Sequence, residues 1–130
     1  MHIEHVAIWT HDLERMRKFY ETYFHASAGE KYTNPAKGYE SYFLSFTSGA
    51  RIEILNRADI APSQNNIDTQ FTGYIHMAIV VGNVANVDAL AKRFTADGYG
   101  IVDGPRRTGD GYYEAVVLDP DGNRVEFCAG

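Results

Sequence analysis

Two segments of the chain share one order of hydrophobic and polar positions. Each begins with a run of small or branched apolar residues typical of a strand, "HVAIW" from residue 5 and "HMAIVV" from residue 76. After a few polar residues, each continues with apolar positions at helical spacing: Leu13, Met16, Tyr20, Tyr23 and Phe24 in the first segment, and Val87, Leu90, Ala91 and Phe94 in the second. The pattern predicts a strand followed by an amphipathic helix, twice over.

The expected helix ends carry the residues that usually cap helices. Asp12 precedes the first helix, and Asn83 or Asn86 can cap the second. Gly98 follows the second helix, where a residue that tolerates left-handed backbone ends a helix well.

The back of each segment reads as a pair of alternating strands. "YESYFLSFTSGARIEIL" turns at Ser48-Gly49, and "YYEAVVLDPDGNRVEFC" turns at "DPDG". A further short strand is expected near residues 27–32 in the first half and near 100–103 in the second. The chain is therefore predicted to be a single α+β domain over 1–130. Its first module covers about 1–56, a polar linker about 57–72, and the second module about 73–130.

Each half places one histidine and one glutamate at equivalent points. His5 and His76 lie on the opening strands, and Glu53 and Glu126 lie on the closing strands, 48 and 50 positions further on. Because side chains alternate along a strand, the four groups can converge on the inner face of the sheets. Unpaired polar groups there would be costly, and a divalent metal held by two imidazoles and two carboxylates removes that cost. Ordinary strand roles, with Glu53 paired to Arg51 and Glu126 to Arg124, are the alternative.

The remaining polar candidates are better explained without a metal. His2 is expected to be exposed, His11 to lie in a turn, and His25 to sit as a cation at a helix C-terminal end. Cys128 is expected to be a packed thiol. The glycine-rich "TGDGYYE" precedes a strand, so it is no phosphate loop, and its Glu114 is a candidate neighbour of the metal ligands.

Composition narrows the possible partners. The chain has 130 residues, 45% hydrophobic content, a formal net charge of −5 and no basic cluster, which argues against nucleic acid or an anionic membrane as a partner. It has no secretory signal and no stretch of membrane-spanning length, and one cysteine rules out an internal disulfide framework. A cytoplasmic location is expected.

The duplicated units and the His/Glu/His/Glu set resemble the vicinal oxygen chelate superfamily, which includes glyoxalase I, extradiol dioxygenases, fosfomycin-resistance thiol transferases and bleomycin-binding proteins. The resemblance covers Ile3 to Phe127 and is sharpest in "HVAIWTHDLERMRKFYETYF", "IHMAIVV" and "LDPDGNRVEF". It implies two βαβββ modules with mixed sheets, each curling into half of an open barrel around a metal. It also implies a homodimer in which His5 and Glu53 of one subunit meet the partner's His76 and the partner's Glu126.

Among these branches, glyoxalase I resembles this chain in its metal site, because it binds its metal through four protein ligands. In this chain the corresponding residues are His5, Glu53, His76 and Glu126. This implies a metal-dependent lyase acting on the small hemithioacetal of a 2-oxoaldehyde and a thiol, which it isomerises to a 2-hydroxyacyl thioester. Nickel or cobalt is the favoured metal, with zinc, manganese and iron as alternatives. Glu126 is the candidate catalytic base, and Glu53 is the second candidate for that role.

One position departs from the glyoxalase I pattern. Trp9 stands where glyoxalase I has a basic residue for the glutathione carboxylate, while Asn56 and Arg57 are near enough in sequence to Glu53 to meet an anionic ligand. The identity of the thiol in the substrate therefore stays open. The alternative functions are another metalloenzyme of the superfamily (dioxygenase-like, thiol transferase or epimerase) and a non-enzymatic small-molecule binder.

Overall fold

The structure, a computed structural model, describes all residues 1–130 and divides into two compact units, Met1–Pro62 and Ser63–Gly130. We call them the first unit and the second unit. The first unit contains, in chain order, β1 (His5–Trp9), α1 (Leu13–Phe24), β2 (Ser27–Ala28), β3 (Tyr32–Asn34), β4 (Tyr39–Ser45) and β5 (Arg51–Arg57). The second contains β6 (His76–Gly82), α2 (Val84–Ala96), β7 (Ile101–Arg107), β8 (Tyr113–Leu118) and β9 (Arg124–Ala129).

These elements confirm an α+β fold built from two βαβββ-type modules with mixed sheets. In the first unit the strand order is β1-β5-β4-β2, with β3 also paired to β4. In the second it is β6-β9-β8-β7. The opening strand of each unit runs parallel to the closing strand, and the other pairs are antiparallel. The curl of each sheet into an open barrel and the grouping of both units as one domain stay predictions.

The predicted helix caps are present. The side chain of Asp12 accepts a hydrogen bond from the backbone N–H of Arg15 at 2.9 Å, and Asn83, rather than Asn86, accepts one from the N–H of Asn86 at 3.1 Å. Gly98 follows α2 with φ of 88°. Neither helix has the length and apolar character needed to cross a membrane.

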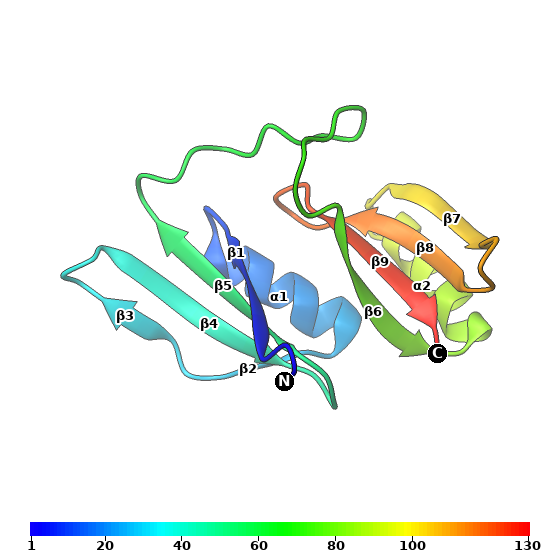
Figure 1. Cartoon of the computed structure of the whole chain (residues 1–130), viewed down its shortest axis with the longest axis horizontal. Coiled ribbons are helices and arrows are strands. Elements are labelled where there is room, and N and C mark those ends of the chain that lie inside the picture. The colour runs from blue at the N-terminus through cyan, green and yellow to red at the C-terminus, as the bar shows by residue number, and fades with distance from the viewer. The chain divides into compact units, whose positions relative to one another are not determined.

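Each helix packs on one face of its own sheet (Figure 1) and buries the stripe that the sequence predicts. In the first unit this layer is largely aromatic, because Phe19, Tyr20, Tyr23 and Phe24 are all buried on α1 over Leu44, Ile52 and Ile54. In the second unit the layer is mainly aliphatic and includes Val87, Ala91, Phe94, Val117, Val125 and Phe127. We call the opposite face of each sheet its open face.

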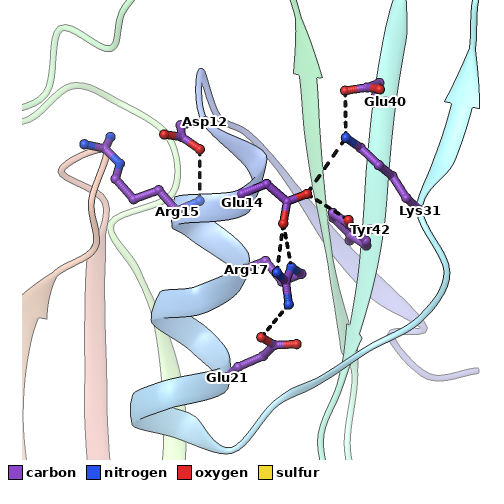
Figure 2. Close-up of polar contacts among 8 residues, drawn as sticks. All are labelled: Asp12, Glu14, Arg15, Arg17, Glu21, Lys31, Glu40 and Tyr42. Carbon is purple, nitrogen blue, oxygen red and sulfur yellow. Dashed lines mark hydrogen bonds and ion pairs between the residues drawn. The ribbon is translucent and has the colours of Figure 1, made fainter.

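A tyrosine also links each sheet to its helix. In the first unit the Tyr42 hydroxyl on β4 donates to Glu14 of α1 at 2.8 Å, and in the second the Tyr113 hydroxyl on β8 donates to Asp88 of α2 at 2.7 Å. Figure 2 shows that Glu14 also meets Arg17 and Lys31, and that Lys31 meets Glu40 of β4, so charged groups link the start of α1 to β4 as well.

Two short strands differ from the sequence prediction. The strand expected near 27–32 is split into β2 and β3, which pair with different parts of β4. The strand expected near 100–103 is longer, because β7 continues through Gly104-Pro105 to Arg107. Proline lacks the N–H that a central strand needs, but β7 is an edge strand with one side unpaired, so the sheet accommodates it.

Candidate metal centre

The first histidine and glutamate lie together on the open face of the first sheet. β1 and β5 run side by side with His5 opposite Arg51 and Ala7 opposite Glu53. Ile52 and Ile54, which flank Glu53 in the chain, are buried, so alternation turns the Glu53 side chain to the open face. The Nε2 atom of His5 is 3.8 Å from Oε2 of Glu53.

The second pair repeats this arrangement. β6 lies along β9 with His76 opposite Arg124 and Ala78 opposite Glu126. Val125 and Phe127 are buried on the helix side, which leaves Glu126 on the open face. The Nε2 atom of His76 is 3.5 Å from Oε2 of Glu126. The same register therefore produces the same pairing twice.

The donor sets fit a divalent cation. Ligand atoms of histidine and carboxylate lie about 2.0–2.2 Å from a metal such as zinc, so two ligands of one ion are roughly 3–4 Å apart. The two Nε2–Oε2 distances, 3.8 and 3.5 Å, fall in that range. No group of three or more histidine, cysteine, aspartate or glutamate side chains is placed to hold a metal ion by itself. Each unit thus offers two candidate ligands, and we call each His–Glu pair a half-site.

The neighbours of the first half-site include a residue that the sequence analysis missed. Glu4, just before β1, contacts Nδ1 of His5 with one carboxylate oxygen and Arg51 with the other. The hydrogen bond with His5, together with Arg51, holds the pKa of Glu4 below its usual value. A charged residue directly before a strand histidine is a weak sequence signal, because neighbouring strand residues point to opposite faces.

The second half-site has a further carboxylate beside it. Glu114 of β8 is mostly buried, and burial, followed by the charge of Glu126, raises its pKa. Arg106 approaches Glu114 at 3.7 Å and is itself held by Asp103, with Nε–O distances of 2.9 and 3.1 Å. Sequence analysis named Glu114 as a candidate neighbour of the ligands but not this Asp103–Arg106 pair.

The surroundings of the other histidines and of the cysteine can be explained without a metal. His2 is exposed, Nε2 of His11 lies 2.7 Å from the carbonyl of Ile60, and His25 caps α1 with left-handed backbone. Cys128 is buried, which raises the pKa of its thiol. The structure agrees with the role expected for Cys128 as a packed thiol.

The two strand arginines have partners other than those considered from the sequence. Arg51 pairs with Glu4 rather than Glu53, and Arg124 donates to the backbone carbonyls of Asn66 and Ile67 at 3.1 and 2.9 Å. Both glutamates therefore keep their carboxylates directed to the histidine on the neighbouring strand.

A positively charged side chain, that of Arg57, lies beside Trp9. The guanidinium of Arg57 lies 5.2 Å from the centre of the Trp9 ring and donates to Asp59 at 2.5 Å. Lys37, Arg57 and Asp59 also line an open cleft of about 400 Å³. Asn56, the other residue considered for an anionic ligand, donates instead to the carbonyl of His11.

Comparison with known protein families identifies the chain. The profile of the Glyoxalase/Bleomycin resistance protein/Dioxygenase superfamily matches residues 2–127. The chain belongs to this superfamily. The resemblance seen in the sequence is thereby confirmed, and the match spans both half-sites.

Solved structures of other superfamily proteins are similar over nearly the whole chain. A trypanothione-dependent glyoxalase I from Leishmania major is 24% identical, with a TM-score of 0.77 over 99% of this chain and 86% of that one. Glyoxalase I from Zea mays is 25% identical, with a TM-score of 0.79 over 99% of this chain and 44% of the maize chain. A lactoylglutathione lyase from Agrobacterium tumefaciens is 23% identical, with a TM-score of 0.68 over 98% and 92%. The comparison with curated proteins gave no match.

Proposed function

We propose that the protein is a metal-dependent, glyoxalase I-like lyase that isomerises the hemithioacetal of a 2-oxoaldehyde and a thiol to a 2-hydroxyacyl thioester. The observation that carries the proposal is the repeated half-site, with His–Glu distances of 3.8 and 3.5 Å on equivalent strand pairs. Two imidazoles and two carboxylates form a four-donor set with a neutral sum of charges around a dipositive ion. The similarity to glyoxalase I structures supports the same reading.

The complete site requires both half-sites to face one cation. We infer that this happens in a homodimer, where His5 and Glu53 of one subunit meet the partner's His76 and the partner's Glu126. Pairing of subunits would also cover the edges of the open sheets, which otherwise present unpaired backbone groups. Nickel or cobalt is the favoured ion, with zinc, manganese and iron as alternatives.

Glu126 carries the proton in this proposal. A bound divalent metal ion would polarise the two neighbouring oxygens of the substrate, so that the C–H proton on the carbon next to the carbonyl would be easier to remove. The Glu126 carboxylate takes that proton from one carbon and returns it to the adjacent carbon, while the hydroxyl proton passes from the oxygen of the first carbon to the oxygen of the second. Glu53 is the second candidate for this role. The carboxylate of Glu114 and the positive charge of Arg106 lie on the same face as Glu126.

The thiol part of the substrate is expected to carry a negative charge. The basic residue that glyoxalase I has at the position of Trp9 is absent, but Arg57 lies over the Trp9 ring. Arg57 and Lys37 together bring two positive charges to the cleft, against one negative charge from Asp59. A carboxylate of the thiol substrate would meet this cleft, and Arg57→Ala should raise KM far more than it lowers kcat.

The test uses metal-free protein reloaded separately with each of the five metals. Thioester formation from methylglyoxal is followed with glutathione, trypanothione and small uncharged thiols. Turnover that depends on metal and is lost in His5→Ala, but kept in the exposed-site control His2→Ala, supports the proposal. Oxygen uptake with iron and no thioester would point instead to a dioxygenase. Ligand binding without metal uptake would point to a binder.

A further inference from the structure

We propose that Glu4, held by Arg51, is a positioning residue that fixes the His5 ring with Nε2 directed to the metal position. The inference rests on the metal site of the proposed function and names a residue outside its four ligands. It also predicts that only the first half-site has its histidine ring oriented in advance, because only His5 has a second carboxylate at its Nδ1 atom.

The contacts around His5 form a closed ring of four side chains. Nδ1 of His5 contacts one oxygen of Glu4, and the other oxygen of Glu4 contacts Arg51. The Arg51 guanidinium lies 4.0 Å from the centre of the Phe43 ring. Phe43 in turn meets the His5 ring edge to face, with centroids 5.3 Å apart and planes at 89°. Each member is thus held from two sides.

This ring determines which nitrogen of His5 carries the proton. An ionised carboxylate can only accept hydrogen bonds, so Nδ1 of His5 must be the donor to Glu4. In the neutral ring the proton on Nδ1 leaves Nε2 with a bare lone pair. That lone pair faces Oε2 of Glu53 across 3.8 Å. Two lone-pair atoms directed at each other are a poor hydrogen-bonded pair but a suitable pair of metal ligands.

The second half-site lacks the equivalent carboxylate. The position before His76 is Ile75, and Glu126 is the only carboxylate within 4.0 Å of the His76 ring. Arg124, which has the register position of Arg51, binds the carbonyls of Asn66 and Ile67 instead. Arg124 therefore provides a matched control for Arg51.

The effect should appear in ligand orientation rather than in stability. The Glu4 and Arg51 side chains are 52% and 38% exposed, and exposed ion pairs contribute little to folding. A carboxylate that orients a ligating histidine typically changes metal affinity by about 10–100-fold. Because these groups are accessible to water, we expect the lower end, about tenfold.

The first measurement is the histidine tautomer in metal-free protein, by long-range ¹H–¹⁵N NMR. His5 should be mainly protonated on Nδ1, and Glu4→Ala should move it toward the mixture seen for another exposed histidine such as His2. Arg124→Ala should leave His5 unchanged. A wild-type His5 without this preference, or one that Glu4→Ala does not alter, overturns the proposal. Far-UV circular dichroism confirms that each variant is folded.

The second measurement is the titration of metal-free protein with Co²⁺ by calorimetry. Glu4→Gln and Glu4→Ala should weaken cobalt binding about tenfold, Arg51→Ala should weaken it by a smaller factor, and Arg124→Ala should match wild type. Equal affinity in wild type and both Glu4 variants overturns the positioning role. Absence of cobalt binding by wild type overturns the metal site of the proposed function, and the tautomer measurement then still decides the role of Glu4.

Discussion

The two units build the same His–Glu pair from the same register but surround it differently. Across the sheet, Glu53 has Phe43 as its partner, whereas Glu126 has Val116 and the nearby carboxylate of Glu114. The strand arginine differs as well, since Arg51 pairs with Glu4 while Arg124 donates to the backbone carbonyls of Asn66 and Ile67. The same backbone arrangement therefore preserves the His–Glu pair, while the residues around the pair differ between the two units.

The largest difference between the two units is expected in how much their glutamates, Glu126 and Glu53, contribute to turnover. Glu126→Gln should lower turnover by a factor of about 10² or more while retaining some metal, because a positioned base typically contributes that much. Glu53→Gln should lower turnover less, since its neighbour is an aromatic ring and not a second carboxylate. Steady-state kinetics with metal content measured for each variant checks this.

Near-normal turnover in Glu126→Gln would contradict the assignment of the base. A larger loss in Glu53→Gln than in Glu126→Gln would reverse the roles of the two units and leave the metal site intact.

The next difference concerns the helix layers. Phe94 is the single buried aromatic residue of α2 and meets the rings of Tyr99 and Phe127, whereas Phe19 lies among three other aromatic rings of α1 itself. A cavity left by Phe19→Ala can be filled partly by those rings, so we expect a loss of about 3 kcal/mol in the free energy of unfolding. Phe94→Ala should cost about 5 kcal/mol. Urea denaturation measures both, and equal losses would show that the aromatic cluster is as rigid as the aliphatic layer.

The smallest difference is expected for the tyrosines that link sheet to helix. The hydrogen bond from Tyr42, together with Arg17, lowers the pKa of Glu14, so this contribution is present above the ordinary value near 4.5 and is lost as pH falls through the lowered value. Tyr42→Phe should therefore lower the denaturation midpoint at pH 7 and have a much smaller effect at a pH low enough to protonate Glu14 in the folded protein. Tyr113→Phe, which removes the 2.7 Å bond to Asp88, is the matched variant at pH 7. An effect of Tyr42→Phe that persists at low pH would assign it to packing.

Much of this architecture could be predicted because local patterns determine it. The 3.6-residue spacing in α1 and α2, the caps at Asp12 and Asn83, and the alternation in β5 and β9 all depend on near neighbours in sequence. The extra length of β7 could not be predicted locally, because Gly104-Pro105 reads as a break unless the strand is known to lie at an edge.

The residues of the candidate site likewise fall into those that the sequence indicates and those that only the structure shows. Repetition alone singled out His5, Glu53, His76 and Glu126, because symmetric polar positions in two apolar strand pairs require a common explanation. Which residues support them was decided only by the tertiary structure. Arg51 is 47 positions from Glu4 in the chain, yet the parallel pairing of β1 with β5 brings the two together. Contacts between strands far apart in sequence depend on register, and register follows from the burial of whole faces rather than from any short stretch of residues.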